Sequence, residues 1–220
     1  MPSLPAAILQ SWQYTVHAAT HSVVLPDGCR DLILLAPAGQ VPQWVVTELD
    51  DTARPLHSAA GDQYWGYRLH PGALVDGDAL LQAIQHSKPR DAHDALALVD
   101  ALVRVDSRVE DALDSLKHST CVASASRQLG VSERSLQRLV TSSTGRAPVY
   151  WRGLARVRRA AQVLAGTWPD APPLAQLAAD HGYADQAHMS RAFRHWLGCT
   201  PSALLASPTL RELVSASGYG

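Results

Sequence analysis

The pattern that most constrains this chain is a helix, a glycine and a second helix, and it occurs twice near the C-terminus. In the clearer copy, residues 174–201, a short amphipathic helix leads to Gly182. Glycine fits there because it adopts the left-handed conformation that ends many helices. A second helix follows, with Met189, Phe193 and Trp196 on one face. This order is typical of a helix-turn-helix, whose second helix enters the major groove of DNA.

A fainter copy lies upstream around Gly130, which corresponds to Gly182. With one residue gained, Gly145 likewise corresponds to Gly198. Such repetition predicts two tandem helix-turn-helix units. A single helix over 148–165 joins them and, at about 1.5 Å per residue, spans roughly 27 Å. That length approaches the ~34 Å between successive major grooves on one face of DNA.

The first 75 residues are β-rich instead, with short apolar runs separated by turn signals such as Pro26-Asp27-Gly28. So short a stretch predicts a small half-barrel or sandwich of four to six strands. Helical patterns follow over 79–84 and 92–105. The sequence does not decide whether the second of these helices packs on the sheet or pairs with its copy in a dimer. The expected strands are 21–25, 31–36, 43–48 and 63–69.

These patterns predict an α+β chain in which a small β-rich half-barrel or sandwich precedes an all-α tandem helix-turn-helix domain. The β-rich part is expected to act in effector sensing, in dimerisation or in both. The expected boundaries are a β-rich domain over 1–75, a helical linker over 76–107, the tandem helix-turn-helix domain over 108–207 and a C-terminal tail over 208–220.

The charge of the chain is divided unevenly, although the net charge is only -1. Residues 1–107 hold 6 Lys+Arg against 12 Asp+Glu, whereas residues 108–220 hold 13 against 8. The basic half is the half that carries the repeats, and its cations are nearly all arginine, which suits bidentate contacts to phosphate and guanine. No apolar run approaches the ~20 residues of a membrane helix, and no secretory signal is evident. We therefore expect a cytoplasmic protein that binds double-stranded DNA and no membrane.

Two stretches resemble the signature of AraC/XylS-type transcription regulators. The residues 182–194, followed by Gly198-Cys199-Thr200-Pro201, resemble the second recognition helix of that family, and the residues 130–139 resemble the first. The resemblance covers about residues 108–207 and departs from the family at Val140, where an aromatic residue is usual. It implies a transcription regulator whose partners are DNA and RNA polymerase. Upstream, 25–33 and 66–72 are similar to a small domain that precedes such DNA-binding units and has no known ligand.

Base contacts are expected from the first two turns of each recognition helix, on the face away from the core. Arginine pairs with guanine and glutamine with adenine, at ~1–3 kcal/mol of discrimination for each bidentate pair. A competing interpretation has Arg138 and Arg191 bonded to helix ends or to Asp180 and Asp185. The expected base contacts are Arg134, Gln137, Arg138, Gln186, Ala187, His188 and Arg191.

Phosphate contacts are expected beside these helices and at the amides of the helices that begin at Pro148 and Pro201. A solvated basic face is the competing interpretation. The expected phosphate contacts are Ser132, Arg146, Arg152, Arg194 and Thr200.

The N-terminal half leaves other functions open. A thiol- or metal-dependent DNA-repair or sensor protein would use Cys29, with Asp27, His57 and His70 as neighbours, but their spacing requires no such site. We expect no enzyme, no metal and no cofactor. A small-molecule effector, a homodimer and an effector-free architectural role all remain open. Aromatic residues could line a ligand pocket, although core packing is the favoured interpretation for Trp12, Trp44, Tyr64, Trp65 and Tyr67.

Overall fold

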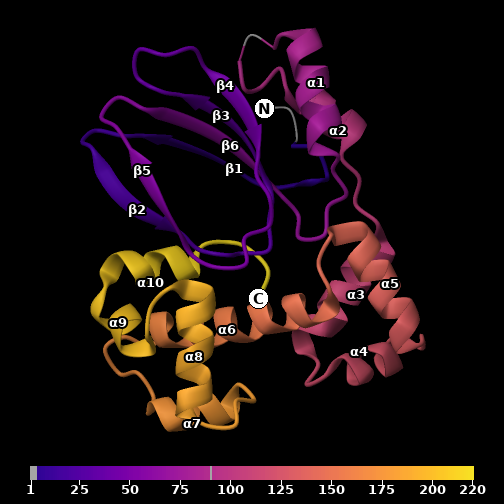
Figure 1. Ribbon diagram of the computed structural model, residues 1–220, viewed down its shortest axis with the longest axis vertical. Coiled ribbons are helices and arrows are strands. Elements are labelled where there is room, and N and C mark those ends of the chain that lie inside the picture. Colours follow the sequence, from indigo (N-terminus) through magenta and orange to yellow (C-terminus); the bar gives the residue numbers. More distant parts are fainter. Residues whose placement is uncertain (1–3, 90) are drawn as a thin grey trace. The chain divides into compact units, whose positions relative to one another are not determined.

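The computed structural model describes residues 4–89 and 91–220, which form two compact units (Figure 1). We call them the sheet unit and the helical unit. The described part of the sheet unit comprises residues 4–22, 29–49, 55–89 and 91–110. The helical unit is built from Asp111–Gly220 and from two short segments of the N-terminal half, Val23–Gly28 and Asp50–Arg54.

The sheet unit contains a four-stranded antiparallel sheet in the order β1-β6-β3-β4. It also contains most of a two-stranded sheet of β2 and β5, whose residues Val23, Val24 and Arg54 belong to the helical unit. Leu32 lies opposite Val46 on one side and Tyr67 on the other, so β3 is paired along both edges. The ring of Trp12 lies against Gly66, where a Cβ would come within 2.0 Å of it. The strands are β1 (Ile8–Thr15), β2 (Thr20–Val24), β3 (Asp31–Ala36), β4 (Gln43–Val46), β5 (Arg54–Ser58) and β6 (Gln63–Leu69).

The expected strands 31–36 and 63–69 coincide with β3 and β6, and those at 21–25 and 43–48 are displaced or shortened by one or two residues. Strands β1 and β5 were not predicted. Polar residues interrupt β1, which lies at the edge of the sheet beside β6. Pro55 makes the start of β5 look like a turn.

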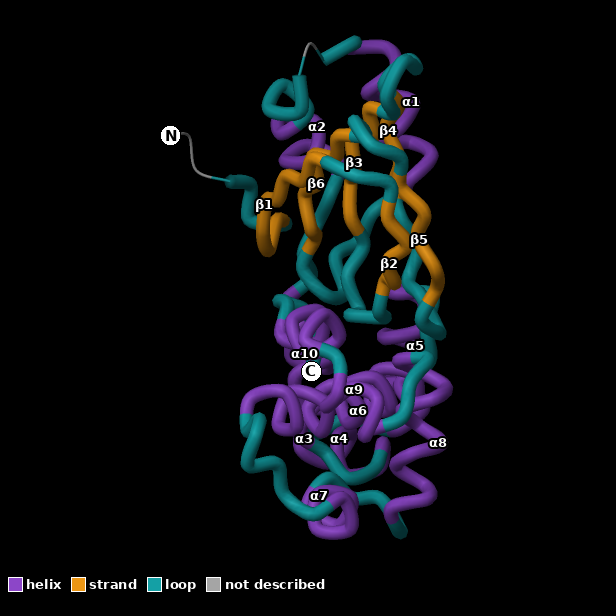
Figure 2. Tube along the Cα trace, turned by 90° about the vertical axis from the view of Figure 1, so that its left-hand side faces the viewer, coloured by secondary structure: helices purple, strands orange, loops and turns teal. Residues whose placement is uncertain are grey.

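Two helices, α1 (Gly77–Ser87) and α2 (Leu96–Leu102), lie beside the four-stranded sheet (Figure 2). Their buried residues complete the core of the sheet unit. Leu96 and Val99 are buried in one cluster with residues of the sheet, so α2 packs on the sheet. The helix is shorter than the expected 92–105 because the chain is extended from Val103 onwards. The Arg104 backbone there forms an isolated bridge with Leu74.

The helical unit is centred on α6, whose Trp151 and Leu154 are fully buried. In the part of the chain that the structure describes, no helix is both long and apolar enough to cross a membrane. The predicted α+β fold class, β-rich first and helical afterwards, is confirmed. The helices are α3 (Ser107–His118), α4 (Val122–Gln128), α5 (Glu133–Thr144), α6 (Pro148–Gly166), α7 (Leu174–Asp180), α8 (Gln186–Leu197), α9 (Pro201–Ala206) and α10 (Pro208–Ser215).

Helix α10 lies in the stretch that was expected to be a tail, and it packs against α6. A sequence signal for it was present. The Ser207 side chain accepts a hydrogen bond from the Leu210 amide, and Pro208 occupies the first turn. Thr200 and Pro201 start α9 in the same way, so the two helices share one start signal.

The segment Val23–Gly28 covers α6 through close backbone contact. Gly28 has a φ of +74°, and a Cβ there would lie 2.8 Å from the Tyr219 Cβ and 3.0 Å from the Trp151 ring. The Asp27 carbonyl accepts a hydrogen bond from the Tyr219 amide at 2.7 Å. A glycine is therefore required at this position for both its conformation and its size.

Candidate nucleic-acid interface

The two helix-turn-helix repeats have matching backbone geometry. In each, a 7-residue helix (α4, α7) precedes a 12-residue helix (α5, α8). The turn between them contains a left-handed glycine, Gly130 with φ +66° or Gly182 with φ +70°. The second helix ends at another, Gly145 with φ +72° or Gly198 with φ +67°. The correspondence inferred from the sequence thus extends to the backbone conformation.

Helices α5 and α8 both begin with a side-chain cap. The Ser132 hydroxyl accepts from the Ser135 amide at 3.1 Å, and the Asp185 carboxylate accepts from the His188 amide at 2.6 Å. These caps satisfy amides that the helix itself leaves without acceptors. They also mark the first residue of each helix.

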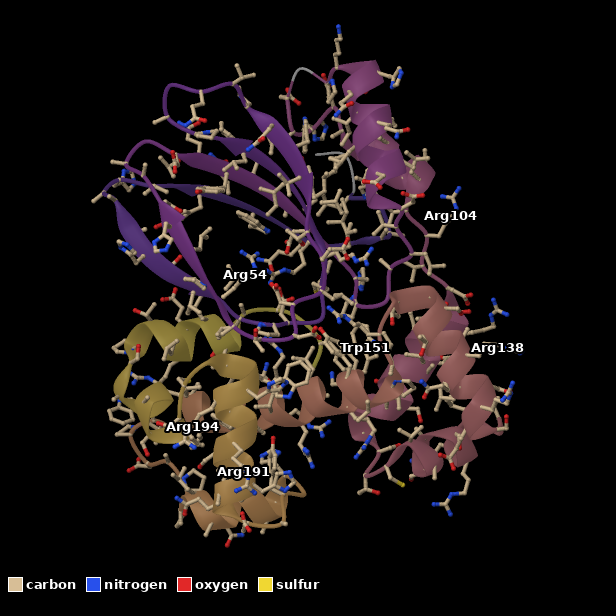
Figure 3. All side chains as sticks on the ribbon, viewed as in Figure 1. Arg54, Arg104, Arg138, Trp151, Arg191 and Arg194 are labelled. Atoms are coloured by element: carbon tan, nitrogen blue, oxygen red, sulfur yellow. The ribbon has the colours of Figure 1, made fainter. Side chains whose placement is uncertain are left out.

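The outward faces of α5 and α8 carry the residues expected to contact bases. On α8, Met189 and Phe193 are fully buried, and Arg191 lies on the exposed side (Figure 3). On α5, Leu136 and Val140 are buried, so the valine that replaces the usual aromatic residue still packs in the core. The exposed residues of the predicted set are Arg134, Gln137, Arg138, Gln186, Ala187 and Arg191.

His188 differs from the rest of the predicted set because it is partly buried. Its ring packs edge-on against Tyr183 at 5.2 Å between centroids, and its Nδ1 accepts from the Ala184 amide at 3.4 Å. Burial, opposed by the nearby Arg156, raises the pKa of Tyr183 to about 12. In this position His188 stabilises the turn before α8, and its predicted base contact remains a prediction.

The arginines of the two faces are available to a ligand. Across the described residues, 4–89 and 91–220, no hydrogen bond or ion pair holds the side chains of Arg134, Arg138 or Arg191. The acidic residues of the competing interpretation have other partners: Asp180 accepts from Gln176, and Asp185 caps α8. The structure thus does not support that competing interpretation.

Three of the expected phosphate contacts lie at or near the ends of α5 and α8. Ser132 caps α5, and Thr200 caps α9 by accepting from the Ala203 amide at 3.1 Å. A hydroxyl that accepts in this way keeps a proton that it can donate to a phosphate oxygen. Arg194 is exposed near the end of α8 (Figure 3).

The four arginines of α6 bond backbone carbonyls of neighbouring segments. Arg152 donates to Ser119 and Thr120, and Arg159 donates to Lys117, at the end of α3. Arg156 donates to the Gly182 carbonyl in the turn of the second repeat. Arg158 donates to the Ala216 carbonyl near the C-terminus and to the Pro26 carbonyl in the segment Val23–Gly28. Cations suit the carbonyl ends of helices.

Arg152 in particular acts as a brace between α6 and the end of α3. Burial, and secondarily the like charge of Arg156, lower its pKa. These surroundings favour a structural role for Arg152, and its phosphate contact stays a prediction.

Arg146 follows the glycine at the end of α5. Its Nη1 lies 2.9 Å from the Asp51 Oδ2, and its guanidinium lies 5.3 Å from the centroid of the Tyr150 ring. The Tyr150 hydroxyl donates to the Asp50 carbonyl at 2.9 Å. Sequence reasoning missed Asp50 and Asp51, because they lie about a hundred positions away from their partners.

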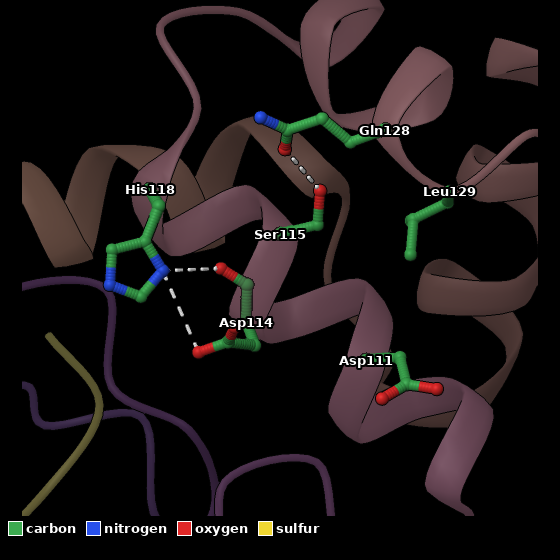
Figure 4. Close-up of a pocket in the computed structure, with 6 residues that line it drawn as sticks. All are labelled: Asp111, Asp114, Ser115, His118, Gln128 and Leu129. Atoms are coloured by element: carbon green, nitrogen blue, oxygen red, sulfur yellow. Dashed lines mark hydrogen bonds and ion pairs between the residues drawn. The ribbon is translucent and has the colours of Figure 1, made fainter.

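A hollow of about 290 Å³ lies between α3 and α4 (Figure 4). Its His118 Nδ1 is 3.6 Å from an Asp114 carboxylate oxygen, and Ser115 donates to Gln128 at 2.9 Å. Two carboxylates, Asp111 and Asp114, make this wall unfavourable for phosphate.

The thiol alternative gains no support from the surroundings of Cys29, which is 5% exposed. His57 packs edge-on against His21 at 4.4 Å between ring centroids. Within the described part of the chain, no three His, Cys, Asp or Glu residues are grouped so as to hold a metal ion.

Comparisons with known proteins bear on the helical part. Residues 125–207 match the model of a family described as a helix-turn-helix domain. No curated protein matches the chain significantly.

Three solved structures illustrate the structural matches. The C-terminal domain of AraT, a response regulator from Geobacillus stearothermophilus, is 24% identical over 47% of this chain and 87% of that one, with a TM-score of 0.42. The DNA-binding domain of AdpA, in complex with a target DNA, is 27% identical over 46% and 88%, with a TM-score of 0.38. ToxT from Vibrio cholerae O395 is 10% identical over 94% and 98%, with a TM-score of 0.47. With TM-scores below 0.5, these superpositions carry no further argument.

Proposed function

Because the C-terminal half of this chain carries a helix-turn-helix domain of the AraC type, we propose that the protein regulates transcription by reading DNA with two recognition helices. The coarser conclusion, a DNA-binding transcription regulator and not an enzyme, rests on that domain. One observation carries the finer proposal. Two repeats with matching turns, caps and helix lengths occur in one unit, and both leave arginine and glutamine side chains exposed.

The helix between the repeats supports binding in adjacent major grooves. Helix α6 has 19 residues, which corresponds to a rise of about 28 Å. Successive major grooves on one face of DNA are ~34 Å apart. Since the arginines of α6 bond carbonyls near both repeats, the helix is suited to hold α5 and α8 at a fixed separation.

Within this proposal the two recognition helices read different bases. On α5, Arg134 and Arg138 offer bidentate donors for guanine, and Gln137 suits adenine. On α8, Gln186 suits adenine, and the Ala187 methyl group suits the thymine methyl group. The other proposed base contacts are His188 and Arg191. The proposed phosphate contacts are Ser132, Arg146, Arg152, Arg194 and Thr200.

The sheet unit is proposed to modulate occupancy of the DNA site. It has its own core of sheet and helix residues, and its acidic charge disfavours contact with DNA. RNA polymerase is the proposed protein partner. A small-molecule effector and a homodimer are further proposals for this unit, which a ligand-dependent rise in thermal stability and a measured mass in solution would test.

Selection of bound duplexes from a random pool tests the proposed function. We expect a site of two conserved segments whose centres lie about one helical turn, or roughly 10.5 base pairs, apart. The selected duplex should outcompete a scrambled duplex of equal length at ~150 mM salt. Equal affinity for both duplexes would overturn the proposal. A selected site with one segment only would show that a single repeat reads the bases.

A further inference from the structure

The segment Asp50–Arg54, which we call the strap, reaches the corresponding position in both repeats. This position, which we call the corner, is where the second helix of the repeat ends at a glycine. Near the first repeat, Asp51 pairs with Arg146, directly after the glycine that ends α5. Near the second, the Ala53 Cβ lies 3.2 Å from the position of a Cβ at Gly198, the glycine that ends α8. Strap and repeats belong to one compact unit, so these contacts are internal to the helical unit.

The two corners differ in a way that makes Arg146 distinctive. The repeats align so that Arg146 corresponds to Cys199, and Ala147 to Thr200. Thr200 caps α9 with its side chain, whereas Ala147 provides no side-chain cap for α6. The first corner therefore carries the cation Arg146 at the position where the second corner carries the neutral thiol Cys199. Only the second corner has a side-chain cap, which Thr200 provides.

Asp51 forms an ion pair with Arg146 much as a phosphate group would. A carboxylate offers a guanidinium the same type of charged oxygen acceptor as a phosphate, and the 2.9 Å distance is that of a charge-assisted hydrogen bond. The Tyr150 ring lies against the guanidinium, and the Tyr150 hydroxyl holds the strap backbone at Asp50. One tyrosine thus contacts Arg146 with its ring and the strap residue before Asp51 with its hydroxyl.

The ion pair is exposed enough to be exchanged. The side chain of Arg146 is 33% exposed and that of Asp51 is 53% exposed. Pairs with this exposure contribute little to folding and are weakened by salt, so a second anion can displace the carboxylate.

From these contacts we propose that Asp51 competes with a DNA phosphate for Arg146, so that the strap lowers the affinity for DNA until a phosphate displaces it. The inference rests on the proposed function, because it takes Arg146 as a phosphate contact. The inference adds a regulatory contact to the proposed function. The strap continues directly into β5, which begins at Arg54.

A set of charge-neutralising variants of the full chain tests the proposal. Affinity for the selected duplex is measured by fluorescence anisotropy over a series of KCl concentrations. Asp51→Asn is expected to tighten binding about 3- to 10-fold at ~0.1 M salt. Arg146→Ala is expected to weaken binding and to make the salt slope shallower by about one. In the Arg146→Ala background, Asp51→Asn should have no further effect.

Asp50→Asn is the matched control, since it removes the same charge from the neighbouring strap residue, whose carboxylate pairs with Arg54 at 3.1 Å. It should tighten binding less than Asp51→Asn does. Equal tightening by the two variants, or tightening by Asp51→Asn that persists without Arg146, would overturn the competition and leave the proposed function intact. Weaker binding of Asp51→Asn would overturn it as well. Failure of the wild-type chain to prefer the selected duplex would overturn the proposed function and this inference with it.

Discussion

The Nε1 of Trp151 donates a hydrogen bond to the Thr144 Oγ1 at 3.1 Å, and both residues are buried. The bond joins the last turn of α5 to α6. The same hydroxyl oxygen accepts from the Arg146 amide at 3.1 Å, so it holds the corner between the two helices. In the second repeat the corresponding residues are Leu197 and Leu204, both buried, so that corner is apolar.

Thr144→Val should destabilise the chain by about 1–3 kcal/mol, because it leaves the Trp151 and Arg146 donors without their acceptor. Urea denaturation followed by circular dichroism measures the change. Thr141→Val is the control: it makes the same substitution on an exposed side of the same helix. An equal cost for both variants would show that the corner bond contributes nothing.

Gly28→Ala should cost more free energy of unfolding than Gly39→Ala. Both glycines have a left-handed φ, +74° and +72°, so an alanine at either is strained by about 1–2 kcal/mol. Only Gly28 would also place a Cβ against Tyr219 and Trp151, which adds about 1–3 kcal/mol of overpacking. Thermal or urea denaturation of the two variants isolates this second contribution. If the two costs were the same, the packing of Val23–Gly28 on α6 would be refuted.

Lowering the pH should reduce the free energy of unfolding through protonation of His181, which lies in the turn of the second repeat. Burial, and secondarily the nearby Arg159, lower its pKa from the usual 6.5. The stability contributed by the neutral ring is therefore complete above pH ~6.5 and is lost as the pH falls through the lower folded pKa.

Measuring the melting temperature between about pH 7.5 and 5.5 tests this prediction. The decrease in melting temperature on acidification should be smaller in His181→Gln than in the unmodified chain. His195→Gln, on the exposed side of α8, is the control. A fall that is unchanged in His181→Gln would assign the pH dependence to other groups.

Arg134→Ala and Gln186→Ala should each relax specificity at one base pair, by about 1–3 kcal/mol. The reason is that each removes donors from one exposed face of one recognition helix. Affinities for the selected duplex and its single-base variants measure the effect. A uniform loss across all duplexes would instead identify a phosphate contact.

Arg152→Ala should lower stability, since its guanidinium bonds the Ser119 and Thr120 carbonyls. Arg194→Ala, which removes the same charge from an exposed site, should leave stability unchanged. Denaturation and salt-dependent DNA binding are measured on both. If Arg152→Ala kept its stability and flattened the salt slope by about one, it would be the phosphate contact that the sequence predicts.

The sequence predicted best what is written in short-range signals. Gly182 and Gly198 mark the ends of helices, and Thr200 followed by Pro201 marks a start, because caps and left-handed glycines are local requirements. These signals sufficed for both repeats, and the helix-turn-helix domain that they predict matches a family model over residues 125–207.

What the sequence could not predict depends on tertiary neighbours. The pairing of Arg146 with Asp51 spans 95 positions, and the bond from Arg158 to Pro26 spans 132. Nothing in the residues around Arg152 distinguishes a brace from a phosphate contact, since both use the same donors. Strand β1 was missed for a similar reason. Its sequence contains several polar residues, and its pairing with β6 exists only in the folded sheet.

The membership of Val23–Gly28 and Asp50–Arg54 in the helical unit has a consequence for modularity. Arg158 is 1% exposed, and two of the carbonyls that it bonds belong to Pro26 and Ala216, at opposite ends of the sequence. A gene fusion that joins residues 108–220 to a foreign sensor would remove Pro26 and leave this guanidinium with one fewer acceptor. The two halves are interwoven along the chain, so a working chimera requires the two short segments to travel with the helices that they cover.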